Sequence, residues 1–259
     1  MAAGAQHHAR EIAEQGYTVL ERTHEPEALE RLTKIIQQIL EDTGLERPYA
    51  AVPRELSKNL VVNPTGLAIF QLVKLAPEAA PLLFSSHLLE AARAALGDDM
   101  FLELTGGSVS DASRPFFTWH HHIGGIDVEG VRQRGELPRL QHCERLIAVT
   151  YLHEIDAEGG ELLAIPRRLG DPMDPRGDER DPDWPGAVTI RFPRGSTLVF
   201  EQSTWHAVRP MQRPGLRMFV GGYFTAQRAP RTELVDESLD GFAGGGSDFQ
   251  QLLAQRPRR

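Results

Sequence analysis

The sequence has a single cysteine and no long apolar segment. Cys143 cannot form an intramolecular disulfide, which is consistent with a reducing compartment, and we expect it to be a buried structural residue rather than a nucleophile. The hydrophobic runs are far shorter than the roughly 20 residues that cross a bilayer. The first ten residues also lack the basic and apolar regions of a signal peptide. These absences predict a cytoplasmic protein with no membrane span.

Basic residues are not gathered into blocks either. The chain carries 28 Lys and Arg against 36 Asp and Glu, which gives a formal net charge of −8. A nucleic-acid-binding protein normally presents a basic patch, so this balance argues against nucleic acid as a partner. Because 41% of the 259 residues are hydrophobic, the chain can bury a sizeable core, and we expect one domain over 1–259.

Hydrophobic patterning divides this domain into three parts. Residues 1–99 are predicted to be a mainly helical N-terminal part, because apolar residues recur at helical spacing after Pro26 and again in a later Ala/Leu-rich stretch. Residues 100–226 contain about seven or eight short β-prone runs separated by turn residues, which is typical of a sandwich or barrel. Residues 227–259 are polar and glycine-rich, and predict a loose tail with one short helix. Helices followed by strands predict an α+β, mainly β domain whose helices buttress a sheet.

The elements expected before residue 100 can be placed more closely. Helices are predicted over 8–15, from Pro26 to just before Gly44, over 66–75 and over 79–96, with a strand over 16–20 and an irregular segment over 47–66.

Three consecutive histidines follow an aromatic, β-prone run. Side chains alternate along a strand, so His120 and His122 are expected on one face and His121 on the other. His206 lies 86 residues after His120 and is also beside a predicted strand. Imidazoles on one face, with a third from elsewhere in the chain, are typical ligands of a divalent first-row metal. His120, His122 and His206 are therefore candidate metal ligands, with a structural histidine cluster as the alternative.

Arg217 begins the last strong predicted strand, 11 residues after His206. A keto acid that chelates a metal requires a cation for its distal carboxylate, and the planar fork of arginine pairs with a carboxylate bidentately. A strand that returns past the metal after a short turn would aim Arg217 inward. Arg209 and Arg213 lie in the turn and are expected to face solvent.

Four further residues are candidates for substrate contact. The irregular segment 47–66 contains Arg54 and Lys58, which could hold an anionic group, since long loops in compact domains are often functional. Trp119 and Trp205 directly precede two of the histidines, so they are expected in the pocket wall or in the core. A solvated connector is the simpler interpretation of segment 47–66.

At these residues the sequence resembles the phytanoyl-CoA dioxygenase-like branch of the Fe(II)/2-oxoglutarate-dependent dioxygenases. The resemblance covers roughly residues 10–225, and its motifs are individually short. Gln15–Leu20 resembles the family's opening strand, and Trp119–His122 resembles its Trp-His-x-Asp motif. Glu158–Leu162, followed by Ile165-Pro166, resembles the Gly-Gly turn and the strand end after it. Arg194–Phe200, followed by His206 and Arg217, resembles the strand that precedes the distal histidine and the keto-acid arginine. It is their order and spacing that make the resemblance strong.

The resemblance implies a double-stranded β-helix, that is, a cupin-like jelly roll, with the metal at its mouth. It implies Fe(II), 2-oxoglutarate and O2 as cofactors, with 2-oxoglutarate decarboxylated to succinate and CO2. It further implies oxidation of an unactivated C–H bond of a small-molecule metabolite. Hydroxylation is the default outcome, and halogenation, desaturation and ring formation are alternatives. The oligomeric state is left open.

One position departs from the family pattern, because His122 stands where the family has an aspartate ligand. In a first interpretation His122 itself binds iron. In a second, the register shifts to His122-Ile123-Gly124, which resembles the His-x-Gly motif of 2-oxoglutarate-dependent halogenases. In a third, Asp127 supplies the carboxylate. Two other functions stay open, namely a three-histidine metalloprotein that does not use 2-oxoglutarate and a non-catalytic binding protein.

Overall fold

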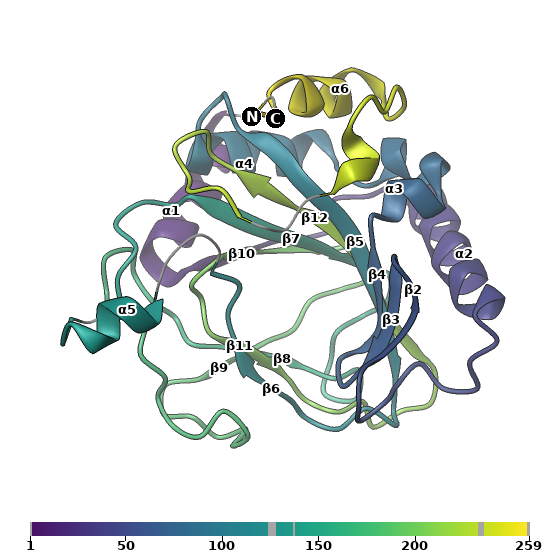
Figure 1. Cartoon of the computed structure of the whole chain (residues 1–259), viewed down its shortest axis with the longest axis horizontal. Coiled ribbons are helices and arrows are strands. Elements are labelled where there is room, and N and C mark those ends of the chain that lie inside the picture. The colour runs from purple at the N-terminus through teal and green to yellow at the C-terminus, as the bar shows by residue number, and fades with distance from the viewer. Residues whose placement is uncertain (1, 124–127, 137, 233–235, 258–259) are drawn as a thin grey trace.

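Two antiparallel β-sheets face each other across the middle of the molecule (Figure 1). The computed structural model describes residues 2–123, 128–136, 138–232 and 236–257. The larger sheet has eight strands in the order β1-β10-β7-β12-β5-β4-β3-β2, and the smaller has four in the order β6-β11-β8-β9. This pair of sheets is the predicted jelly roll.

Neighbouring strands in each sheet are mostly distant in sequence, so the sheets bring remote segments together. The larger sheet contains β1 (Tyr17–Leu20), β2 (Arg54–Ser57), β3 (Leu60–Asn63), β4 (Gly66–Phe70), β5 (Phe101–Asp111), β7 (Arg145–Tyr151), β10 (Thr197–Glu201) and β12 (Leu216–Thr225). The smaller sheet contains β6 (Phe117–His120), β8 (Leu162–Ala164), β9 (Val188–Ile190) and β11 (His206–Val208).

Helices cover the outer face of the larger sheet, as the order of helical segments before strands predicted (Figure 1). They are α1 (Ala2–Gln15), α2 (Pro26–Asp42), α3 (Leu72–Leu75), the 3-10 helix η1 (Pro77–Leu82), α4 (Ser86–Leu96) and α6 (Gly246–Ala254), while α5 (Val128–Gln133) and the 3-10 helix η2 (Glu237–Leu239) lie in later loops. Each of the described helices is too short or too polar to cross a bilayer.

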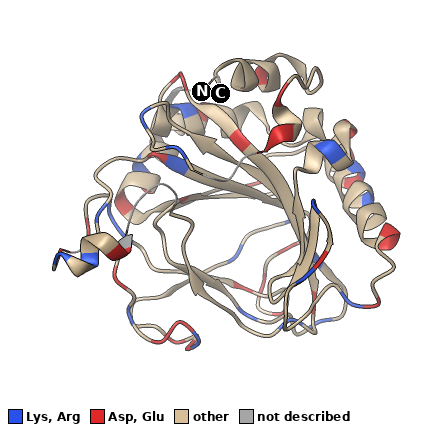
Figure 2. Ribbon diagram, viewed as in Figure 1, with Lys and Arg blue, Asp and Glu red and all other residues tan. Residues whose placement is uncertain are grey.

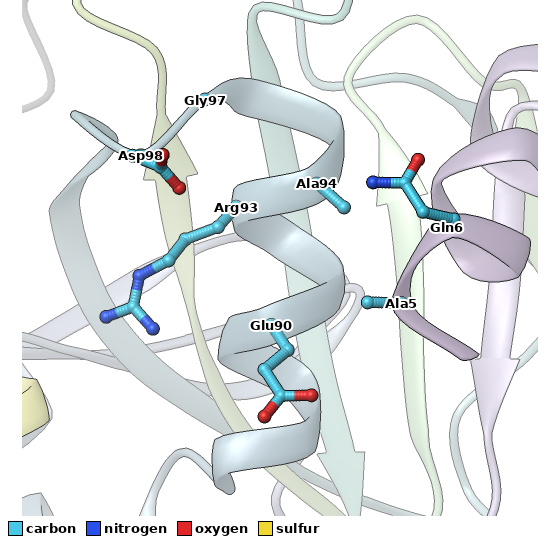
Figure 3. A pocket seen from close by; sticks show the side chains of 7 residues that line it. All are labelled: Ala5, Gln6, Glu90, Arg93, Ala94, Gly97 and Asp98. Carbon is cyan, nitrogen blue, oxygen red and sulfur yellow. The ribbon is translucent and has the colours of Figure 1, made fainter. Parts of the chain in front are cut away.

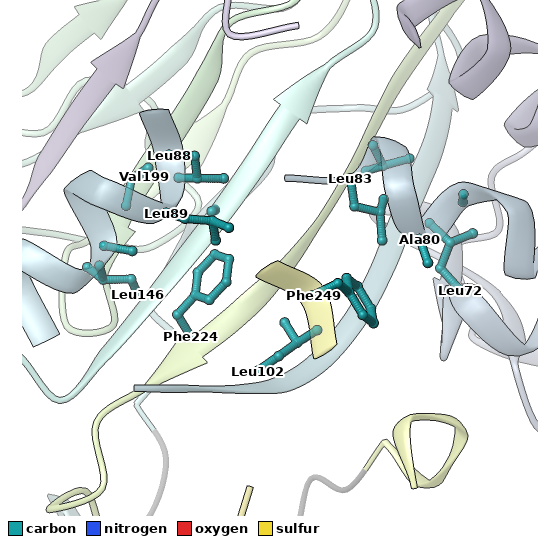
Figure 4. Close-up of a cluster of buried hydrophobic side chains, with 14 of the residues drawn as sticks. Leu72, Ala80, Leu83, Leu88, Leu89, Leu102, Leu146, Val199, Phe224 and Phe249 are labelled. Atoms are coloured by element: carbon teal, nitrogen blue, oxygen red, sulfur yellow. The ribbon is translucent and has the colours of Figure 1, made fainter. Parts of the chain in front are cut away.

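The main hydrophobic core lies between these helices and the larger sheet. Helix α2 starts with proline at its first turn, as predicted, and buries Leu32 and Ile36 one turn apart. Figure 4 shows Leu89 of α4 packed beside Phe224 of β12. Cys143 is buried in this core, and burial raises the pKa of its thiol well above the usual value, which agrees with a structural role. In Figure 2, charges of both signs are mixed over helices and loops, while most strands carry neither.

The predictions for residues 47–75 are wrong in part. Strands β2, β3 and β4 occupy the segment that was expected to be irregular and the start of an expected helix, and α3 is only four residues long. Leu67 and Ile69 are buried on one side of β4, and residues 66–69 of this strand pair with the full length of β3. The apolar run 66–75 is too short for its periodicity to separate a strand from a helix, so pairing with β3 and β5 decided its structure.

The C-terminal segment is not the loose tail that its composition predicted. The side chain of Asp236 is buried and accepts hydrogen bonds from the backbone N–H and the hydroxyl of Thr105, at 2.9 and 3.0 Å. In α6, Phe249 and Leu252 are buried against the main core. Two apolar residues three positions apart are enough to hold a short helix on a sheet that offers them a hydrophobic surface.

Candidate metal and keto-acid site

The side chains of His120, His122 and His206 converge between the two sheets. His120 is the last residue of β6 and lies opposite His206 of β11 in the antiparallel register. His122 lies beyond the end of β6, so strand alternation does not set the direction of its side chain. Its backbone is held by a hydrogen bond, in which its N–H donates to the carbonyl of Gln202 at 2.8 Å. One nitrogen from each ring lies within 4.8 Å of the other two. In the described part of the chain, this is the one group of three His, Cys, Asp or Glu side chains so arranged.

Hydrogen bonds fix the orientation of two of these rings. The Nδ1 atoms of His120 and His206 each lie 2.9 Å from a backbone carbonyl oxygen, of Thr118 and Thr204 respectively. A carbonyl only accepts, so each Nδ1 carries the proton and each Nε2 presents a lone pair. The Nε2 atoms of His122 and His206 are 3.2 Å apart. Such a pair is stable only with a proton or a cation between the nitrogens, so the donor set fits a metal ion.

Burial keeps the three imidazoles neutral. Burial lowers the pKa of His120 to about 4 and that of His122 to about 3, and it holds the pKa of His206 well below its usual value. The neutral imidazole is the form that binds a metal, so the rings need not lose a proton near pH 7. His121 behaves as predicted, because its ring packs on Trp205 with centroids 4.5 Å apart.

Tyr223 of β12 supports His122 and was not predicted. Its hydroxyl lies 2.9 Å from Nδ1 of His122. Burial raises the pKa of Tyr223 well above its usual value, so the hydroxyl is neutral and can accept a hydrogen bond from Nδ1–H of His122, which leaves Nε2 of His122 free for a metal. A signal for it existed in the sequence: Tyr223 is six residues after Arg217, so alternation places both on the same face of the strand.

Replacing this hydroxyl should weaken metal binding while leaving the fold intact. Tyr223→Phe is expected to lower the affinity of the metal-free protein for Co(II) about tenfold, because outer partners of ligating histidines are worth roughly 10–100-fold. Absorption titration with Co(II) measures this, and Tyr17→Phe in β1 is the matched control. An affinity within twofold of the wild-type value for Tyr223→Phe would contradict the assignment.

The three histidines line a cavity of about 370 Å³ between the two sheets. Arg217 lines the same cavity and is buried, as predicted, with Nη2 donating to the hydroxyl of Tyr151 at 3.1 Å and the guanidinium lying 4.9 Å from the Tyr151 ring centroid. Its buried Nε has no hydrogen-bond partner. Among the described residues no carboxylate pairs with Arg217, so a buried cation faces the cavity without a counter-ion, which fits an anionic ligand.

A second buried arginine, Arg114, lines the cavity and was also missed. Its Nη1 and Nη2 donate to the carbonyls of Pro115 and Arg209 at 2.8 and 2.9 Å, and its buried Nε has no partner. Burial, together with the charge of Arg217, lowers the pKa of Arg114 to about 9. Two such cations at one cavity strengthen its attraction for a carboxylate. No local pattern in the sequence marks Arg114, because all its carbonyl partners except that of the adjacent Pro115 lie far along the chain, at Val208 and Arg209.

The comparisons with known proteins agree with this architecture. No protein-family model and no curated protein sequence matches the chain. Among solved structures, the α-ketoglutarate-dependent carbocyclase SnoK from nogalamycin biosynthesis is similar, with a TM-score of 0.61 and 18% identity over 85% of this chain and 83% of SnoK. EctD from S. alaskensis, solved with 2-oxoglutarate and 5-hydroxyectoine, has a TM-score of 0.62 and 20% identity over 87% of this chain and 77% of EctD.

A third similar structure is HygX from Streptomyces hygroscopicus, solved with nickel and 2-oxoglutarate. Its TM-score is 0.61, with 14% identity over 86% of this chain and 87% of HygX. The chain shares their jelly-roll fold. At these identities the likeness establishes the fold, and the chemistry of the site has to be argued from this chain's own residues.

The two tryptophans beside the histidines lie outside the cavity lining. Trp119 stacks on Trp184 with ring centroids 4.7 Å apart, and its Nε1–H donates to the carbonyl of Asp181. Trp205 packs against the same Trp184 ring, with centroids 5.3 Å apart. Both therefore belong to a hydrophobic cluster behind the smaller sheet, on the opposite side of β6 and β11 from the cavity.

The cations proposed for substrate are not brought to the cavity lining. Arg54 is exposed in β2, and Lys58 is exposed in the turn before β3. From the same segment, Asn63 and Thr65 do line the cavity. Asp127, the third interpretation of the missing carboxylate ligand, lies outside the described residues.

A second hollow lies on the surface between α1 and α4 (Figure 3). Its charged lining residues are Glu90, Arg93 and Asp98. Arg93 donates to the side chain of Gln251 at 3.2 Å, so this cation already has a partner. The hollow contains no metal-ligand group among the described residues, and the candidate site is therefore the cavity between the sheets.

His153 lies beside Arg217 and makes stability depend on pH. The backbone N–H of Met218 donates to its Nδ1 at 3.2 Å, which requires an unprotonated Nδ1, and its Nε2 is buried without a partner. Burial first, and then the charges of Arg217 and Arg213, lower the pKa of His153 to about 3.

Acid should therefore destabilise the metal-free protein partly through His153. Below about pH 6.5 the unfolded chain binds a proton that the folded chain does not, so the free energy of unfolding falls as pH drops from there toward about 3. This group contributes at most about 2 kcal/mol of loss between about pH 6.5 and pH 5. Urea unfolding at both pH values should show a smaller loss for His153→Asn, whose oxygen can replace Nδ1, than for the exposed control His142→Asn. Equal losses would contradict this account.

Proposed function

We propose that the protein is an Fe(II)/2-oxoglutarate-dependent oxygenase that oxidises an unactivated C–H bond of a small molecule, with hydroxylation as the default outcome. One observation carries the proposal: a single cavity is lined by three neutral imidazoles with converging nitrogens and by Arg217, a buried cation without a carboxylate partner. A metal would bind the imidazole nitrogens, and a keto acid would supply the carboxylate that Arg217 lacks. One keto acid can do this because it chelates the metal at one end and pairs with a guanidinium at the other.

The comparisons and the sequence motifs support this assignment. EctD and HygX were both solved with 2-oxoglutarate, and HygX also with a metal. The order of the sequence motifs resembles that of the phytanoyl-CoA dioxygenase-like branch of these enzymes and supports the same assignment. O2 is the co-substrate that this chemistry requires.

The residues of the chain have distinct roles in this proposal. His120, His122 and His206 would hold Fe(II), which together with 2-oxoglutarate and O2 supplies the oxidising power when bound. Rings from both sheets fix the ligands: Phe117 packs on His120 and Phe200 stacks on His206, with centroids 4.2 and 4.3 Å apart. These phenylalanines also line the cavity, where they exclude water from the metal end.

We propose His122 as the third ligand in place of the usual carboxylate. Its nitrogen lies within the ligand group, and its other nitrogen is engaged by Tyr223 in the manner of a ligating histidine. A third neutral ligand leaves the site one unit more positive than two histidines and a carboxylate. The additional positive charge strengthens the attraction of the site for the anionic keto acid.

Anaerobic titration with Fe(II) and 2-oxoglutarate tests the function directly. We expect a visible metal-to-ligand charge-transfer band that requires both components, and succinate after O2 is admitted. Zn(II) binding with neither band nor succinate would instead indicate a three-histidine metalloprotein of another class. Failure to bind either metal would indicate a non-catalytic binding protein, and both of these results overturn the proposal.

A further inference from the structure

The inner face of the larger sheet has a stretch without side chains. One row of inward-facing positions crosses four neighbouring strands: Phe70 of β4 lies opposite Gly106 of β5, Gly106 opposite Gly221 of β12, and Gly221 opposite Val149 of β7. All four residues line the cavity. The two central positions of the row therefore expose peptide backbone to the cavity instead of side chains.

The glycines next in each strand face the other side of the sheet. Gly107 and Gly222 line the cavity with their backbone, but a Cβ at these positions would point toward Ile36 and Phe84 in the main core. A Cβ at Gly221 would overlap the carbonyl oxygen of Ala148, and one at Gly106 would lie 2.7 Å from that of Ile69. The close approach of the strands thus requires glycine at both positions. The result is a flat peptide surface, which we call the glycine floor and define as Gly106 and Gly221.

The walls around the glycine floor are apolar or uncharged. Leu104, Ile147 and the ring of Phe70 line the cavity beside it. Phe70 is 47% exposed, which is unusual for a phenylalanine and is explained if its ring forms the edge of a binding surface. The polar lining outside the metal and arginine end carries only uncharged groups, for example Asn63 and Ser108.

Charge is confined to one part of the cavity. Within the described lining, Arg114 and Arg217 are the only side chains that are charged near neutral pH. The proposed function uses Arg217 for the keto acid, and the Nη atoms of Arg114 already donate to the backbone carbonyls of Pro115 and Arg209. A charged substrate would therefore lose its hydration without gaining a free counter-ion. The cavity of about 370 Å³ is near the lower end of ligand pockets, roughly 300–1,000 Å³, and it must also hold the keto acid.

We propose that the substrate is a compact, uncharged molecule with a flat ring face, seated on the glycine floor against Phe70. Its polar groups are hydroxyls or carbonyls, which the uncharged lining can bind. This inference rests on the proposed function, because it assigns the arginine end to 2-oxoglutarate. It disfavours amino acids, nucleotides and acyl-CoA thioesters, whose charged groups find no partners beyond that end.

Three probes that share one ring system test the inference by calorimetry. They are 2-naphthol, which is neutral, 2-naphthoate, an anion, and 2-naphthylmethylammonium, a cation. With Ni(II) and excess 2-oxoglutarate present, 2-naphthol should bind at least tenfold more tightly than either charged probe. Equal affinities, or a preference for a charged probe under these conditions, would overturn the inference.

The same titrations without Ni(II) and 2-oxoglutarate separate this inference from the proposed function. Naphthoate should then gain affinity by pairing with Arg217, while 2-naphthol should change little. If adding 2-oxoglutarate does not remove that gain, the keto-acid assignment fails, whatever the neutral probe does. If the gain is removed but 2-naphthol does not bind, the keto-acid assignment stands and the substrate class is wrong.

Variants locate the probe on the glycine floor. Phe70→Ala should weaken 2-naphthol binding about tenfold, whereas Leu75→Ala, at a residue 38% exposed and outside the cavity lining, should leave it unchanged. Ala68→Asp places a carboxylate in the cavity lining beside Phe70 and should raise the affinity for the ammonium probe to at least that for 2-naphthol. An unchanged affinity for 2-naphthol in Phe70→Ala would show that the probe binds elsewhere and would overturn the placement.

Discussion

Replacing any one of His120, His122 and His206 with alanine is expected to lower the affinity for Fe(II) at least about 100-fold and to abolish succinate formation. The three Nε2 atoms form one donor group, and loss of a ligand must cost more than the roughly 10–100-fold that follows loss of a residue supporting one. Calorimetric titration of the metal-free variants with Fe(II) under anaerobic conditions gives the affinity. His121→Ala is the matched control, because that ring faces Trp205, and its affinity should stay within about threefold of wild type.

The pattern across the three variants also decides between the interpretations of the third ligand. If the register were His122-Ile123-Gly124, His120→Ala would leave metal affinity nearly unchanged and chloride would alter the spectrum of the metal-bound protein. If Asp127 supplied the ligand, His122→Ala would be the tolerated variant. Equal and large losses in all three variants are the result we expect from the observed convergence of the three rings.

Arg217→Ala is expected to weaken 2-oxoglutarate binding by roughly 30-fold to 5,000-fold, since truncating one partner of a buried charge pair costs about 2–5 kcal/mol. The guanidinium is buried, lines the cavity and has Tyr151 as its one hydrogen-bonded side-chain partner among the described residues. Fe(II) affinity in the absence of 2-oxoglutarate should change little, because Arg217 is not among the candidate ligands. Titration of the charge-transfer band with 2-oxoglutarate separates the two affinities.

Two further variants make this result specific. Arg217→Lys keeps the charge but loses the bidentate fork, so its 2-oxoglutarate affinity should lie between those of the alanine variant and wild type. Arg209→Ala is the control for loss of a nearby cation, because Arg209 is more exposed and pairs with Asp183 at 3.3 Å. If Arg217→Ala binds 2-oxoglutarate as tightly as Arg209→Ala does, Arg217 is not the keto-acid residue.

Much of the fold and the centre of the site could be predicted from local patterns. The short β-prone runs separated by turn residues after residue 100 predicted the strands of the jelly roll, because strand-favouring and turn-favouring residues act locally in the chain. His120, His206 and Arg217 were placed correctly toward one cavity for a similar reason: each lies in a strand or at its end, where local geometry sets the direction of the side chain.

Local patterns were therefore enough to predict most of the strands after residue 100 and which of their residues face inward. What those residues contact depends on the tertiary structure. Strand pairing over long sequence separations turned residues 54–70 into three strands and placed Tyr223 on His122. It also aligned glycines of β5 and β12 into one floor. Such contacts depend on register between distant segments, which no local pattern encodes, and that is why the histidines were predicted and their surroundings were not.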